Sequence, residues 1–193
     1  MMSSMLVLLL VVIPMALQAC ALAFDEFHYH HKRGLPRWEC IGHPLDTLTV
    51  LAVASISCFF PLSGVSLVAF VVGGFLSCLF VTKDEWVHAK LCDAGEQWLH
   101  SILFVCHPLV FVSTAILWSW RDKPHVLGLD ATFVPQVNMM LMGQVLLLAG
   151  FMAYQIIYWN FVRQPVSDSD EKLKLQEKKS GSADPRSFVS RTG

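Results

Sequence analysis

The feature that most constrains this chain is a run of 36 residues, 47–82, that contains no Asp, Glu, Lys or Arg. Three further charge-free runs cover residues 1–24, 97–120 and 131–162. A helix at the surface of a water-soluble core carries charges on its wetted side, whereas a segment that crosses ~30 Å of hydrocarbon needs about 20 mostly apolar residues. The sequence therefore predicts an integral membrane protein.

The longest run predicts two spans, because Pro61-Leu62-Ser63-Gly64 at its centre is typical of a tight turn. No run shows the period-two alternation of a membrane β-barrel. The expected fold class is an all-α, five-helix transmembrane bundle within residues 1–163, followed by a polar, disordered tail over 164–193. The five helices are expected at 3–24, 46–60, 64–82, 98–119 and 137–161.

Basic residues predict the orientation of this bundle. With five spans, residues 25–45, 83–97 and 162–193 share one face, which holds twelve of the 14 Lys and Arg residues. The positive-inside rule makes that face cytoplasmic, with the N-terminus outside and the C-terminus in the cytoplasm. Residues 5–17 have the composition of a signal peptide, but no basic residue precedes them. We therefore expect the first helix to be kept as a span of a multi-pass membrane protein.

Small and polar residues inside the spans predict how the helices meet. Gly73-x-x-x-Ser77, and Gly143 with Gly150, indicate close helix packing. Gln144 and Gln155 lie on one face of the last helix and are expected to form hydrogen bonds with neighbouring helices.

Histidines and carboxylates gather in segments 25–45 and 83–107 of the predicted cytoplasmic face. An acid and an imidazole recur there at spacings of three or four, which places both on one side of a helix. In a continuous helix over 84–118, several of these groups would form one polar stripe, with Gly95 as its weakest point. Pro44 is expected in the first turn of its helix.

His107 lies about 12 Å below Trp98 by helix rise, a depth at which a polar side chain should face the interior of the bundle. Two interpretations stay open. His107 is either a metal ligand or proton acceptor, or a packing histidine that forms a hydrogen bond with a neighbouring helix.

Carboxylates and imidazoles together suit Fe, Mn or Zn, and two-metal sites in helix bundles combine Glu with Glu-x-x-His from facing helices. We expect a transition metal, iron first. His30, His43, His88 and His100 are predicted to meet at one cavity. The alternative is a set of hydrated interfacial groups that neutralise nearby basic side chains. The candidate ligands are Glu26, His30, Glu39, His43, Glu85, His88, Glu96, His100 and His107.

These features predict a membrane-bound, metal-dependent oxidoreductase of the hydroxylase or desaturase type, acting on a lipid-like or quinone-like substrate at the cytoplasmic face. The alternatives are a metal or proton-linked transporter and a non-catalytic membrane scaffold or assembly factor. A transport path should place acidic or histidine residues across the membrane, yet the predicted helices 64–82 and 137–161 contain no Asp, Glu or His. The net charge of −1 gives no electrostatic basis for binding nucleic acid.

Overall fold

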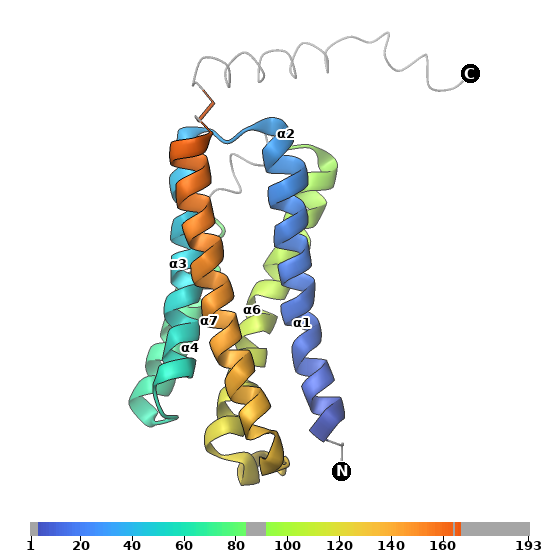
Figure 1. Ribbon diagram of the computed structural model, residues 1–193, viewed down its shortest axis with the longest axis vertical. Coiled ribbons are helices and arrows are strands. Elements are labelled where there is room, and N and C mark those ends of the chain that lie inside the picture. The colour runs from blue at the N-terminus through green and yellow to red at the C-terminus, as the bar shows by residue number, and fades with distance from the viewer. Residues whose placement is uncertain (1–3, 84–91, 164, 167–193) are drawn as a thin grey trace, which may run out of the picture.

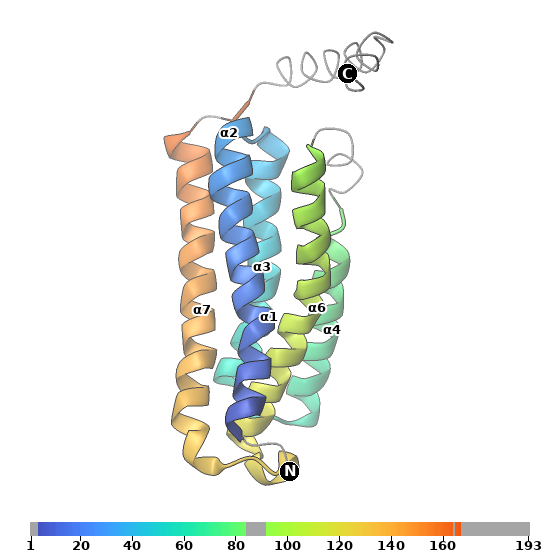
Figure 2. The same ribbon diagram turned by 90° about the vertical axis from the view of Figure 1, so that its right-hand side faces the viewer.

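A computed structural model describes residues 4–83, 92–163 and 165–166 of the chain. Throughout these residues the fold is helical and contains no strand, with the long helices side by side (Figures 1 and 2), which confirms the predicted fold class. The main helices are α1 (Ser4–Phe24), α3 (Arg37–Phe59), α4 (Gly64–Phe80), α6 (Ala94–Asp122) and α7 (Val134–Ile157).

Four helical segments of the described chain are long and apolar enough to cross a membrane: Ser4–Arg33, Arg37–Phe59, Ala94–Asp122 and Ala131–Val162. The first consists of α1, the π-helical turn η1 (Asp25–His30) and α2 (His31–Arg33). The last adds η3 (Ala131–Phe133) and η4 (Tyr158–Val162) to α7, after the short helix η2 (Pro124–Leu127). The fifth helix, α4, is apolar but has 17 residues, which span about 26 Å.

The helices pack in a definite order. α1 lies against α6, and α3 lies against both α7 and α4 (Figure 1), whereas α1 and α7 make few direct contacts. The start of α1 and the end of the segment formed by α7 and η4 lie at opposite ends of the bundle (Figure 1). The assignment of the Val162 end to the cytoplasm stays a prediction from the basic residues.

Helix α3 begins at Arg37, so the expected start at residue 46 is wrong. Gly34 makes the preceding turn, with a φ of 73° that favours glycine. Pro44 therefore lies inside α3 and not in its first turn. Proline has no N–H for the carbonyl four residues earlier. That carbonyl, of Cys40, instead accepts a hydrogen bond from the Asn160 side chain at 3.4 Å, which explains how the proline is accommodated.

Helix α6 begins at Ala94, after Asp93 adopts an extended conformation with a ψ of 159°. The hypothesis of one continuous helix over 84–118 is therefore wrong. Residues 84–91, which include the candidate ligands Glu85 and His88, lie outside the described part of the chain, as does nearly all of the predicted tail.

Contacts within the bundle separate two kinds of predicted packing residue. The glutamines behave as expected: Thr47 donates to Gln155 at 2.8 Å, and Gln144 donates to Thr114 at 3.1 Å. A methyl group added at Gly73 would meet Val53 at 3.0 Å, which fits close packing of α4 on α3. At Gly143 it would meet nothing within 4 Å, and the same holds at Gly150. Close packing at these two glycines is therefore not found within the described bundle.

The bundle is packed with apolar side chains at the end that contains Ser4 and the α3–α4 turn. Leu117, Trp118 and Trp120 of α6 are fully buried there. Trp118 donates its indole N–H to the carbonyl of Phe60 at 3.0 Å, and Arg121 donates to the same carbonyl at 2.7 Å. This end is therefore closed by packing and by satisfied backbone groups.

Candidate metal centre

The first part of the candidate site forms where α1 widens into the π-helical turn η1. Hydrogen bonds in a π-helix join residues five apart, and such turns are frequent at functional sites. Asp25 and His30 thus lie side by side, with 3.2 Å between Asp25 Oδ2 and His30 Nε2. Only spacings of three and four entered the sequence-based prediction, so Asp25 was missing from the predicted ligands.

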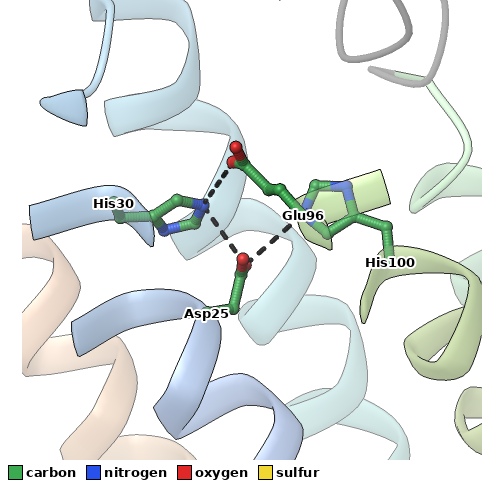
Figure 3. A group of neighbouring side chains, drawn as sticks. All are labelled: Asp25, His30, Glu96 and His100. Atoms are coloured by element: carbon green, nitrogen blue, oxygen red, sulfur yellow. Dashed lines mark ion pairs between the residues drawn. The ribbon is translucent and has the colours of Figure 1, made fainter. Parts of the chain in front are cut away.

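Helix α6 contributes the other half of this group from its first two turns. Glu96 and His100 are four residues apart and share one face. His100 Nε2 lies 3.5 Å from Asp25 Oδ2, and Glu96 Oε1 lies 4.0 Å from His30 Nε2 (Figure 3). The ligand atoms of Asp25, His30, Glu96 and His100 all lie within 4.8 Å of one another, and all four residues are buried. We call these residues the four-residue group.

A second group shares His30 with the first and takes its other members from α3. Ligand atoms of His30, Glu39 and His43 lie within 4.8 Å of one another. His43 Nε2 is 3.8 Å from Glu39 Oε2, and the rings of His30 and His43 have centroids 4.8 Å apart. The structure thus brings together three of the four histidines predicted to converge. The fourth, His88, lies outside the described residues.

Arg33 links the two groups through its guanidinium. It binds Glu39 with both terminal nitrogens, at 3.0 and 2.8 Å, and donates to Glu96 Oε1 at 3.1 Å. Such forked contacts to carboxylates are among the strong charge-assisted hydrogen bonds. Glu39 is fully buried, so Arg33 neutralises a carboxylate that has no access to water. The predicted pairing of basic and acidic side chains is present here, but inside the bundle and not on a hydrated surface.

Glu26, a predicted ligand, lies behind His30 and belongs to neither group. Its Oε2 is 3.3 Å from His30 Nδ1, and its Oε1 accepts hydrogen bonds from the Trp159 indole at 2.5 Å and the Tyr154 hydroxyl at 3.1 Å. A carboxylate on the far nitrogen of a histidine commonly orients that histidine toward a metal ion. Trp159 and Tyr154 were not predicted, because nothing in the sequence pairs them with residue 26.

Asp25 has the least satisfied charge of the cluster. It is 4% exposed, and its partners in the described chain are the imidazoles of His30 and His100. Within the same residues its Oδ1 has no hydrogen-bond partner, and His30 Nε2 has none with acceptable geometry. A buried carboxylate is costly unless a cation or donors compensate its charge. An additional cation can therefore compensate the charge of Asp25.

His107 lies apart from both groups, with both ring nitrogens in contact with protein side chains. Its Nε2 is 3.1 Å from Ser77 Oγ, and its Nδ1 is 3.4 Å from Gln18 Nε2. The residue is 6% exposed and faces the interior of the bundle, as its depth predicted. This geometry favours the interpretation as a hydrogen-bonded interior histidine.

A cavity of about 130 Å³ connects His107 with the four-residue group. Asp25, His43 and His100 line the cavity on the side of the two groups described above. Gln18 and His107 line it two helical turns further along α1 and α6. The walls between them are mainly apolar. They include Leu22, Val50, Leu103, Phe104, Leu148 and Phe151.

Two imidazoles and two carboxylates converging in a buried position form a donor set that suits Fe, Mn or Zn. The four-residue group can therefore hold a metal ion next to an apolar cavity. Comparison with family models, curated proteins and solved structures gave no match, so the interpretation of this site depends on its own chemistry.

Proposed function

We propose that this chain is a membrane metalloenzyme. The four-residue group binds one transition-metal ion, most suitably iron, and the protein oxidises a lipid-like or quinone-like molecule. Asp25, His30, Glu96 and His100 are the proposed ligands. Glu26 orients His30, and Arg33 holds Glu39 and Glu96 in place.

One observation carries the proposal: Asp25 is buried, its Oδ1 has no hydrogen-bond partner among the described residues, and two imidazole nitrogens lie 3.2 and 3.5 Å from its Oδ2. A divalent cation compensates this charge without protonating two neighbouring imidazoles. Metal–nitrogen and metal–oxygen bonds of about 2.0–2.2 Å place ligand atoms roughly 3–4 Å apart, which is close to the spacing in the group.

The oxidoreductase part of the proposal is supported by the surroundings of the group. Asp25 and His100 line both the metal group and the cavity, so a molecule in the cavity can approach a bound ion. The apolar walls suit a substrate that enters from the bilayer. Iron is favoured over zinc because a mixed imidazole and carboxylate set with open positions is the usual environment of non-haem iron.

Metal analysis after purification in mild detergent tests the proposal. We expect about one equivalent of a transition metal in the natural chain, and loss of most of it in Asp25→Asn and His100→Ala. His125→Ala is the matched control, because His125 is exposed at the other end of the bundle. Less than about a tenth of an equivalent in the natural chain would contradict the proposal.

The same preparations distinguish an enzyme from a transporter. In proteoliposomes, a transporter would take up labelled metal, and His100→Ala would abolish the uptake. We expect binding without uptake, because the opposite end of α6 is filled by Leu117, Trp118 and Trp120.

A further inference from the structure

A chain of four hydrogen bonds runs from the rim of the bundle to the cavity. Thr49 Oγ1 donates to the carbonyl of Asp46 at 2.7 Å, and Ser77 Oγ lies 2.7 Å from Thr49 Oγ1. His107 Nε2 then lies 3.1 Å from Ser77 Oγ, and Gln18 Nε2 lies 3.4 Å from His107 Nδ1.

The Asp46 carbonyl determines which group donates and which accepts in each of these four hydrogen bonds. A carbonyl only accepts, so the Thr49 proton points to Asp46, and Ser77 must donate to Thr49. Ser77 then accepts from His107, which places the imidazole proton on Nε2. His107 is neutral at this depth, because charge is costly inside a membrane. Its Nδ1 therefore carries a lone pair and accepts a hydrogen bond from the Gln18 amide N–H.

This direction determines how the Gln18 amide is turned, independently of how similar its nitrogen and oxygen are in shape. The NH₂ group faces His107, so the oxygen faces away from it. Gln18 lines the cavity, and its Oε1 is buried without a hydrogen-bond partner in the described chain. Asp25 also lines the cavity, and its Oδ1 is likewise buried without a hydrogen-bond partner in the described chain. Two residues that line the cavity thus each carry a buried acceptor oxygen that lacks a donor in the described chain.

A molecule that satisfies these acceptors must itself donate a hydrogen bond. A hydroxyl group does so, whereas the carbonyl oxygens of a quinone and the oxygen of an ether only accept. The cavity volume of about 130 Å³ is close to that of engineered protein cavities of roughly 150 Å³ that hold benzene. A ring or short chain of similar size fits between the apolar walls.

We infer that this cavity binds a hydroxyl-bearing apolar molecule, such as a phenol or quinol, with its hydroxyl group donating to Gln18 Oε1. The inference deepens the proposed function by selecting a hydrogen-bond donor as the substrate class. It rests on the proposed function only in assuming a metal ion beside the cavity. Gln18 itself belongs to neither group of candidate ligands. We expect the molecule to enter from the bilayer between α1 and α7, which carry Gln18, Leu22, Leu148 and Phe151 and make few direct contacts.

Fluorine NMR binding of two matched probes, 4-fluorophenol and 4-fluoroanisole, tests this inference on the full chain in detergent, with and without metal. The variant Leu148→Trp, designed to fill the cavity, is the control: the probe signal that remains with it reports partitioning into the detergent. After that correction, we expect the phenol to bind about tenfold more tightly than the anisole, because only the phenol donates to the buried oxygen. The preference should persist after chelation, which separates this result from the metal proposal.

Variants on the chain of hydrogen bonds complete the test. Gln18→Met should remove the preference for the phenol over the anisole, because the thioether sulfur is only a weak hydrogen-bond acceptor. Ser77→Ala should also reduce the preference, because His107 can then move its proton to Nδ1 and the Gln18 amide can turn over. Equal binding of both probes to the natural chain would overturn the inference, with water as the partner of Gln18. A preference that survives in both variants would overturn it too.

Discussion

The two halves of this bundle are built from the same helices but are packed in opposite ways. Toward the Ser4 end, the fully buried residues of α6 include Leu117, Trp118 and Trp120. Toward the Val162 end, the same helix presents Glu96 and His100, and the neighbouring α3 buries Glu39 completely. The half toward Ser4 is held together by packed apolar side chains. The half toward Val162 is held together by ion pairs and hydrogen bonds between buried charged groups.

This difference indicates a division of labour along each helix. Membrane helices gain little from burying apolar groups, because lipid is as apolar as the protein, so close packing must hold the first half together. Buried charges contribute little net stability, and removing one partner is expensive. The polar half is thus suited to holding a site, and the apolar half to holding the helices that carry it.

The largest expected effect on stability comes from replacing Arg33, the arginine that binds two carboxylates in the polar half. Arg33→Met leaves Glu39 and Glu96 without their shared partner, and should lower the free energy of unfolding by about 3–5 kcal/mol, measured by denaturation in mixed micelles. The neighbouring exposed Lys32→Met should change it by less than about 0.5 kcal/mol. Adding Glu39→Gln to Arg33→Met should recover part of the loss. Failure to do so would show that Arg33 acts by packing alone.

A smaller effect is expected from a cavity in the apolar half. Leu117→Ala should lower the free energy of unfolding by about 1–3 kcal/mol, below the usual range for water-soluble cores, since contacts are lost but little transfer from water is involved. Metal content should stay unchanged, as measured on the same preparations. A parallel loss of metal would mean that the two halves are coupled, and would break the comparison drawn above.

Glu26→Gln should weaken metal binding without abolishing it. Glu26 contacts His30 on the nitrogen remote from the four-residue group, at 3.3 Å, so it affects the orientation of a ligand. We expect the dissociation constant for the metal ion to rise by roughly 10- to 100-fold, as measured by competition with a chelator. Tyr154→Phe, which removes one donor to Glu26, should show the same effect in weaker form. Complete loss of metal in Glu26→Gln would make Glu26 itself a ligand.

The smallest effect concerns the glycines. Gly143→Ala adds a methyl group where nothing lies within 4 Å, and should change the free energy of unfolding by no more than about 1 kcal/mol, in the stabilising direction. Gly73→Ala brings the same methyl group to 3.0 Å from Val53 and should destabilise. If Gly143→Ala destabilises as well, a contact with a second copy or another chain at that glycine becomes the better explanation, which oligomeric state in detergent would check.

The sequence predicted the fold well, because the absence of charge over long runs has one physical explanation. Helix limits were less predictable. α3 extends back to Arg37 although it contains Pro44, and Asn160, 120 residues further along the chain, donates to the Cys40 carbonyl that the proline leaves without a helical partner. Such compensation cannot be read from a local pattern.

The candidate site was predictable where it follows α-helical spacing, as in Glu39 with His43 and Glu96 with His100. It was not predictable where it depends on a change of helix type or on a distant partner. Asp25 joins His30 through a π-helical turn, and Trp159 reaches Glu26 across 133 residues. A search for acid–imidazole pairs five apart would have found Asp25.

The fork of Arg33 has a consequence for how the protein is made. Its partner Glu96 lies 63 residues later, beyond α3 and α4. A nascent chain inserted only through its first helices therefore carries an arginine and several carboxylates at the end of a span with no complete set of neighbours. Those groups must stay at the aqueous border until α6 arrives. If the four-residue group binds a metal ion as proposed, the ion can be bound only after α6, which supplies Glu96 and His100, has joined the first helix.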